Sequence, residues 1–218
     1  MERRRTAHVP TGDISASLRR DLDPQHGTSF VELLASTLLI SLLMAMSYGF
    51  ARSVFLSARV QEAKSDAQEV TLMAVDLLTR EVRMAGFSAA GKPLVGVRVA
   101  AAEHVEVASD FDGDGDSDEA NELIAYSYND KKHQLVRATG GASPQPLVPN
   151  VPPGGLHFSF FDPSGAEIPI PASGLPLEER RRIRRIDVVL RTQSADADLA
   201  GALPSISTVS SSICLRNQ

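Results

Sequence analysis

The chain has no tryptophan, one cysteine and few aromatic side chains, and this composition limits which disulfides and which kind of hydrophobic core it can form. Because Cys214 is the only cysteine among the 218 residues, no disulfide can form within the chain. Aromatic residues make up only 5% of the sequence, so we expect a core built mainly of aliphatic side chains. Cys214 lies in a strand-like segment near the end of the chain, where we expect its thiol to be buried.

The sequence also has little positive charge and none of the common catalytic motifs. Lys and Arg number 22 against 27 Asp and Glu, which gives a formal net charge of −5. An acidic chain lacks the basic face on which nucleic-acid binding depends, so we expect no nucleic-acid partner. The sequence contains no G-x-S-x-G, H-E-x-x-H, C-x-x-C or phosphate-binding loop. We therefore predict that the protein is not an enzyme.

One long stretch carries no charge at all: residues 33–51, which read LLASTLLISLLMAMSYGFA. As a helix with a rise of about 1.5 Å per residue it would be about 30 Å long, the thickness of a bilayer's hydrocarbon core. The five arginines of residues 1–27 favour a cytoplasmic N-terminus. The pattern predicts one transmembrane segment at about 30–51 in the inner membrane, N-terminus inside, with residues from about 52 onward in the periplasm.

A helical pattern continues beyond the uncharged stretch. From Arg52 to Met84 there is neither proline nor glycine, and Gly86 is placed to end a helix. The spacing therefore predicts one helix over residues 28–85, whose second half is amphipathic and packs on a globular domain. Apolar residues that recur at intervals of mostly three and four form the expected buried stripe: Ala63, Ala67, Val70, Ala74, Leu77, Leu78, Val82 and Ala85.

After Gly86 the pattern becomes strand-like. Segments with partial alternation and many Val, Ile, Phe and Tyr residues predict strands at 104–109, 122–128, 134–138, 156–161, 186–192 and 206–216. Residues 140–155 and 168–176 are rich in Pro and Gly and predict loops. A long helix followed by strands predicts an α+β fold with an antiparallel sheet on the helix's apolar stripe. The charged residues 178–185 are expected to be a solvated face or to pair with a neighbouring subunit.

An acidic stretch, ASDFDGDGDSDEANE at residues 108–122, is the strongest candidate for a metal site. Its aspartates and Gly115 match positions of the D-x-[DN]-x-[DN]-G calcium loop, in which alternate oxygen ligands converge on one ion. The twelfth position holds Asn121, so Glu122 is expected to supply the bidentate ligand in a calcium-binding β-loop. A solvated acidic turn is the alternative. The predicted Ca²⁺ ligands are Asp110, Asp112, Asp114, Asp116, Asp118 and Glu122.

The junction at Gly27 carries a resemblance to a known family. Gly27 is followed by Thr28, and Glu32 is the fifth residue after that glycine, at the start of the apolar helix. This arrangement resembles the class III signal of type IV prepilins and pseudopilins. The resemblance implies that a prepilin peptidase removes residues 1–27 and that the new amine of Thr28 is methylated. A carboxylate in lipid needs a partner, and the cationic amine of the same or a neighbouring subunit would neutralise Glu32.

Further segments are similar to the PilW family of minor pilins and to J-type minor pseudopilins: residues 77–87, 112–116, 121–128, 181–192 and 215–217. The resemblance implies a pilin-like fold with a leader (1–27), a long helix (28–86) and a β-rich domain (87–218). It also implies a minor pilin in a priming or tip complex of a type IV pilus, located in the pilus after assembly. Its expected partners are the peptidase, and other minor and major pilins through the helix.

Two alternatives remain open from the sequence. A minor pseudopilin of a type II secretion system would carry the same signal. A membrane-anchored, calcium-dependent periplasmic binding protein or enzyme belongs to a different class, and would need the apolar anchor but not the spacing of Gly27 and Glu32.

Overall fold

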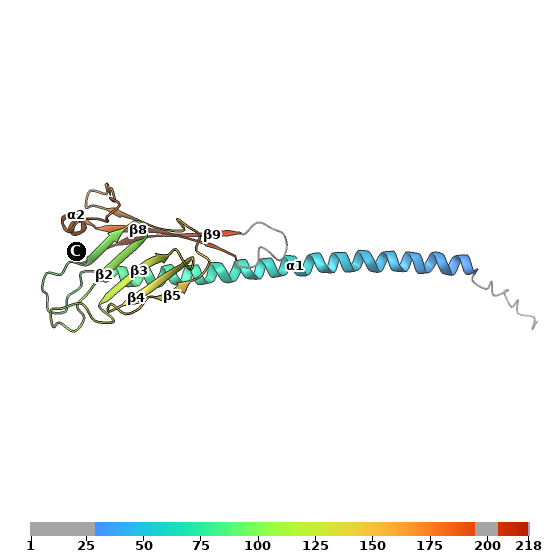
Figure 1. Cartoon of the computed structure of the whole chain (residues 1–218), viewed down its shortest axis with the longest axis horizontal. Coiled ribbons are helices and arrows are strands. Elements are labelled where there is room, and N and C mark those ends of the chain that lie inside the picture. Colours follow the sequence, from blue (N-terminus) through green and yellow to red (C-terminus); the bar gives the residue numbers. More distant parts are fainter. Residues whose placement is uncertain (1–28, 195–204, 218) are drawn as a thin grey trace, which may run out of the picture. The chain divides into compact units, whose positions relative to one another are not determined.

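The computed structural model describes residues 29–194 and 205–217 (Figure 1). The chain forms two compact units, Met1–Ala51 and Arg52–Gln218. Helix α1 (Phe30–Arg83) contributes to both, and it confirms the prediction of one helix that runs on from the apolar stretch. The positive φ of 79° at Gly86 fits the role predicted for this glycine just beyond the helix end.

The second unit contains two antiparallel sheets and the C-terminal part of α1. The first sheet has the strand order β1-β2-β3-β4-β5, and the second has the order β7-β6-β8-β9. The α+β class is confirmed, although the sequence predicted one sheet. The strands are β1 (Val97–Ala101), β2 (His104–Ala108), β3 (Leu123–Asn129), β4 (Gln134–Thr139), β5 (Gln145–Val148), β6 (Leu156–Phe161), β7 (Glu167–Ile168), β8 (Arg185–Gln193) and β9 (Ile206–Cys214).

Both sheets contact α1. The Thr71 hydroxyl lies 2.9 Å from that of Thr192 in β8, and Arg137 in β4 reaches α1 from the other sheet. The predicted stripe is right at four buried positions: Ala74, Leu78, Val82 and Ala85. It is wrong at Val70, which is 40% exposed, because α1 at this point borders an open cleft instead of the sheet core.

Sequence patterns missed three strands and one short helix. The strand β5 lies in the Pro-rich stretch that predicted a loop, and it contains Pro146. Proline is tolerated there because β5 is at the edge of its sheet, where a missing N–H breaks no ladder. The edge strands β1 and β7 were also missed. Within the charged stretch, Leu177–Arg182 forms helix α2, whose Arg182 pairs with Asp162 and Glu179.

The expectation for Cys214 is corrected by the structure, which shows an exposed thiol. Cys214 lies in a strand, as the sequence predicted, and is the last residue of β9, but its neighbour Ile213 is the residue that points into the core. Because successive side chains of a strand point to opposite faces, burial of Ile213 turns Cys214 outward.

A polar network joins α1 to the first sheet. Glu81 in α1 accepts hydrogen bonds from Arg137 in β4 at 2.6 and 2.9 Å, and from the hydroxyl of Tyr126 in β3. Burial, followed by the bond to Glu81, holds the pKa of Tyr126 well above its usual range, so the phenol stays neutral and donates. The network fixes how the sheet sits on the helix.

The variant Glu81→Gln should lower the free energy of unfolding by about 2 kcal/mol, because it leaves the half-buried Arg137 without its counter-charge. The matched control is Asp76→Asn, which removes an exposed ion pair with Arg80 on the same helix and should change stability by less than about 0.5 kcal/mol. Urea unfolding of the full chain in detergent, followed by circular dichroism, measures both. Equal effects would show that the network adds nothing beyond a surface ion pair.

Candidate functional site

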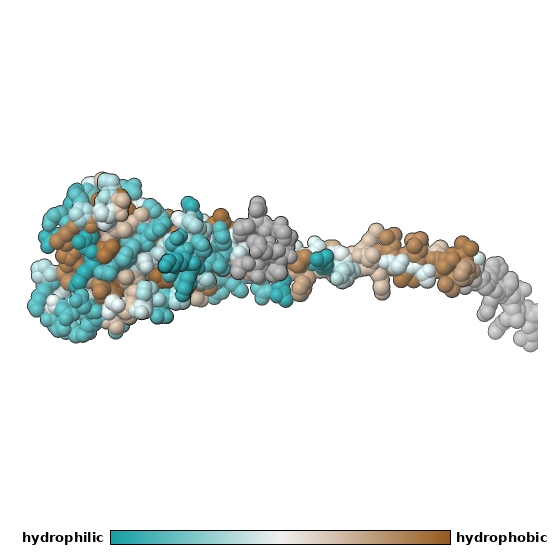
Figure 2. Space-filling model, in the orientation of Figure 1, coloured by the Kyte–Doolittle hydropathy of each residue, from teal (hydrophilic) through white to brown (hydrophobic). Residues whose placement is uncertain are grey.

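The first candidate feature is the apolar part of α1. The helix is long and apolar enough to cross a membrane, and none of its most apolar stretch is buried. Residues 29–55 are exposed throughout, and mostly apolar side chains cover this part of α1 (Figure 2). Leucine and phenylalanine are rarely exposed in such number unless another apolar phase covers them. Length and composition therefore favour a membrane anchor.

Glu32 is the single charged residue between His26 and Arg52, and the structure places it in the first turn of α1. Its side chain is exposed, and its carbonyl oxygen accepts a hydrogen bond from the Ser36 hydroxyl at 2.7 Å. A carboxylate in the first turn is favoured by the helix dipole. The predicted cleavage and methylation residues, Gly27 and Thr28, lie outside the described residues.

The second candidate feature is the acidic loop between β2 and β3. Its backbone is shaped by the aspartates themselves: the carboxylates of Asp112, Asp114 and Asp116 each accept a hydrogen bond from the N–H two residues further on, at 2.8–3.1 Å. Gly113 and Gly115 have φ values of 82° and 97°, which side-chain-bearing residues rarely adopt. The alternation of Asp and Gly thus folds the loop into successive tight turns.

Asp110 anchors the start of this loop on the segment that follows α1. Its N–H donates to the carbonyl of Phe87 and its carbonyl accepts from the N–H of Ala89, both at 2.8 Å. Its carboxylate accepts from the Ser88 hydroxyl at 2.9 Å and from the Gly113 N–H at 2.7 Å. As a result, the Asp110 side chain is only 2% exposed. The loop is therefore attached to the chain just beyond the helix end.

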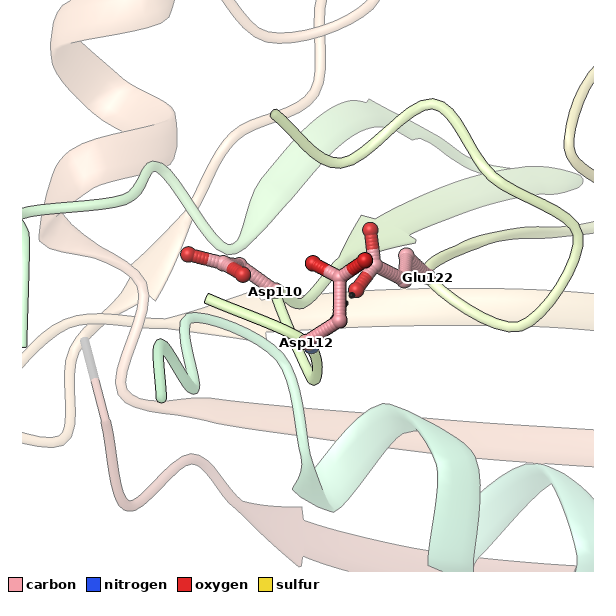
Figure 3. Close-up of side chains that lie close together, drawn as sticks. All are labelled: Asp110, Asp112 and Glu122. Carbon is pink, nitrogen blue, oxygen red and sulfur yellow. Dashed lines mark hydrogen bonds between the residues drawn. The ribbon is translucent and has the colours of Figure 1, made fainter. Parts of the chain in front are cut away.

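The structure brings three of the six predicted ligands together. One carboxylate oxygen from each of Asp110, Asp112 and Glu122 lies within 4.8 Å of the others, and the Glu122 carboxyl group turns toward the two aspartates (Figure 3). Glu122 is 3% exposed. Its Oε1 accepts from the N–H groups of Phe111 and Asp112. Its Oε2 is buried without a hydrogen-bond partner in the part of the chain that the structure describes.

The other acidic residues of the loop lie elsewhere. Asp114 joins Asp112 and Glu119 in a second, fully exposed cluster, where repulsion from Asp112 and then Glu122 raises the pKa of Glu119. Asp118 pairs with Arg98 at 3.1 Å, and neither it nor Asp116 belongs to a cluster among the described residues. Glu119 was missed by the sequence pattern because it falls outside the series of alternate positions.

No family model matches the chain, and no match was found among curated proteins. The structure defines a coarse class: an α+β protein whose long N-terminal helix has an exposed, apolar segment suited to a membrane. A finer assignment depends on the residues described above.

Proposed function

We propose that this protein is a minor pilin: a membrane-anchored subunit that a prepilin peptidase processes and that joins a type IV pilus through α1. The observation that carries the proposal is Glu32, a lone carboxylate in the first turn of an exposed apolar helix. A plain anchor would place an apolar residue there, because a carboxylate in lipid costs several kcal/mol without a partner. The position five residues after Gly27 supplies that partner if cleavage occurs there.

The chemistry proceeds in three steps. Hydrolysis of the peptide bond between Gly27 and Thr28 releases residues 1–27 and creates a new amine. A sulfonium methyl donor transfers a methyl group to the deprotonated amine and leaves as a thioether, and the methylated amine is again cationic once it takes up a proton. Glu32 neutralises this amine on its own or a neighbouring subunit, which sets the position of one helix against the next. The exposed apolar side chains of α1 then leave lipid and pack against other pilins, through a surface that includes Leu38, Leu42 and Phe50.

Exposed apolar side chains also continue along α1 beyond the uncharged stretch. Val70, Leu72 and Met73 are between 40% and 61% exposed in the part of α1 that belongs to the second unit. Apolar side chains at these positions suit lateral contact with a neighbouring helix, because helix surfaces associate by burying such stripes. This feature supports assembly through α1 over more than its membrane segment.

A pseudopilin of a type II secretion system would use the same cleavage, amine and carboxylate. The two systems differ in their product, so deletion of the gene should remove surface pili in one case and block protein secretion in the other. The segments 77–87 and 121–128 resemble both PilW-type minor pilins and J-type minor pseudopilins, so this deletion is the experiment that decides between the two systems.

The direct test is the mass of the mature protein. In cells that contain prepilin peptidase, membrane-extracted protein should begin at Thr28, with or without one added methyl group. In cells that lack the peptidase it should retain residues 1–27. A Gly27→Leu variant should remain unprocessed in both strains, because the bulky side chain blocks the cleavage position. An intact N-terminus in the presence of the peptidase would refute the proposal. It would favour the alternative of a membrane-anchored, calcium-dependent binding protein or enzyme.

A further inference from the structure

We propose that Asp110, Asp112 and Glu122 bind one Ca²⁺ ion, which ties the acidic loop to the chain segment just beyond α1. This site is narrower than the one the sequence predicts, because it omits Asp114, Asp116 and Asp118. It is also independent of filament assembly, since every group that forms it lies in the second compact unit.

The buried oxygen of Glu122 is the observation that points to a ligand. Oε1 is satisfied by two backbone N–H groups, whereas Oε2 is buried and has no hydrogen-bond partner among the described residues. A buried carboxylate oxygen without a donor is strongly destabilising. The Glu122 carboxylate also lies close to the carboxylates of Asp110 and Asp112, which have the same sign. A cation placed among the three would satisfy Oε2 and remove the repulsion.

The geometry fits a calcium ion. Oxygen ligands lie about 2.3–2.6 Å from Ca²⁺, so two ligands on opposite sides of the ion are about 4.6–5.2 Å apart. The three carboxylate oxygens lie within 4.8 Å of one another, a spacing close to that of three ligands around one Ca²⁺ ion. Hydrogen bonds from Ser88 and Gly113 hold the Asp110 carboxylate in place and leave lone pairs on its oxygens. Three carboxylate oxygens, one from each residue, and three to five waters would together supply the roughly six to eight oxygen ligands that Ca²⁺ takes.

The positively charged side chains near the loop contact residues outside the proposed site. Arg98 pairs with Asp118, and the Lys92 ammonium lies against Gly115, on the part of the loop that the proposed site omits. Within residues 29–194 and 205–217, none of the ion pairs includes Asp110, Asp112 or Glu122. The three carboxylates of the proposed site therefore have no ion-pair partner within the described part of the chain.

A bound ion would make the chain segment that follows α1 more rigid. Asp110 is bonded through its backbone to Phe87 and Ala89, and the Phe87 ring lies 5.6 Å from the ring of Phe111. Glu122 also lines a cleft of about 330 Å³, which gives solvent an approach to this side of the loop. Calcium bound by these carboxylates would therefore link β2, β3 and the turn after the helix.

The test uses the full chain in detergent, stripped of metal with a chelator, and compares CaCl₂ with MgCl₂ by calorimetry and thermal unfolding. We expect a dissociation constant of about 0.1–1 mM for Ca²⁺, as in other extracellular modules. At about 10 mM Ca²⁺ the melting temperature should rise by about 3–6 °C. The rise in MgCl₂ should be less than about half as large, because Mg²⁺ gives up its water reluctantly. Calcium should also slow amide exchange at Ala89 and Asp110.

Two variants test whether Glu122 binds the metal or only supports the structure of the loop. In Glu122→Gln the amide oxygen still accepts from Phe111 and Asp112, so the metal-free protein should be at least as stable as wild type, while Ca²⁺ affinity falls at least about tenfold. Asp116→Asn, in the same loop but outside the cluster, should keep the calcium response. No calcium-specific shift in the wild type, an equal shift with Mg²⁺, or a full response in Glu122→Gln would each overturn the proposal.

Discussion

A Glu32→Leu variant should be processed normally yet be almost absent from filaments. Leucine removes the carboxylate that neutralises the amine of Thr28, and a cation left unpaired at the edge of lipid costs about 3 kcal/mol. Since 1.4 kcal/mol corresponds to a factor of ten, incorporation should fall about a hundredfold. The leader is still removed, because the residues that flank the cleavage position are unchanged. The measurement is the ratio of subunit in sheared filaments to subunit in membranes, by immunoblot.

The matched control is Glu62→Leu, which removes an exposed glutamate from α1 in the second compact unit. This variant loses the same charge on the same helix but leaves the helix start untouched, so its incorporation should stay within about twofold of wild type. If Glu32→Leu entered filaments as well as Glu62→Leu did, the carboxylate would have no part in assembly. Unchanged secretion and unchanged surface pili in cells that carry Glu32→Leu would contradict the proposed function directly.

Among replacements of a glycine by alanine in the described part of the second compact unit, Gly96→Ala should be the most destabilising. A Cβ atom at Gly96 would lie 2.3 Å from the nitrogen of Gly86 and 2.6 Å from the carbonyl carbon of Ala85. Both neighbours are backbone atoms, so no flexible side chain can move away. The contact is also locked by hydrogen bonds, because Ala108 donates to the Gly96 carbonyl and accepts from the Gly86 N–H, both at 2.8 Å.

We expect Gly96→Ala to lower the free energy of unfolding by about 3 kcal/mol or more, since the backbone itself must shift. For a chain of this size the melting temperature should fall by about 6–12 °C. The control is Gly141→Ala, where φ is +69° but no atom lies within 4 Å of the added methyl. Its loss should be about 1 kcal/mol, from backbone strain alone. Equal losses in thermal unfolding would mean that the close approach at Gly96 relaxes freely.

The sequence alone predicted much of the fold, and the success followed the strength of the local pattern. The helix and six of the strands were found, because periodicity and β-branched residues mark them within a short window. The strand β5 was missed because Pro146 normally breaks a strand, and only the sheet order shows that it lies at an edge. Val70 was placed in the core because periodicity assigns a face but not how far the sheets extend along it.

For the candidate sites, the sequence by itself determined the uncharged run of α1, the position of Glu32 immediately before that run, and a loop with an excess of carboxylates. These are properties of composition and spacing. Only the tertiary structure decided that Asp110, Asp112 and Glu122 meet, that Asp118 turns instead to Arg98, and that Glu122 Oε2 is buried without a donor. Such contacts depend on where β2, β3 and the turn after α1 lie relative to one another, because burial and charge pairing are set by neighbours distant in sequence.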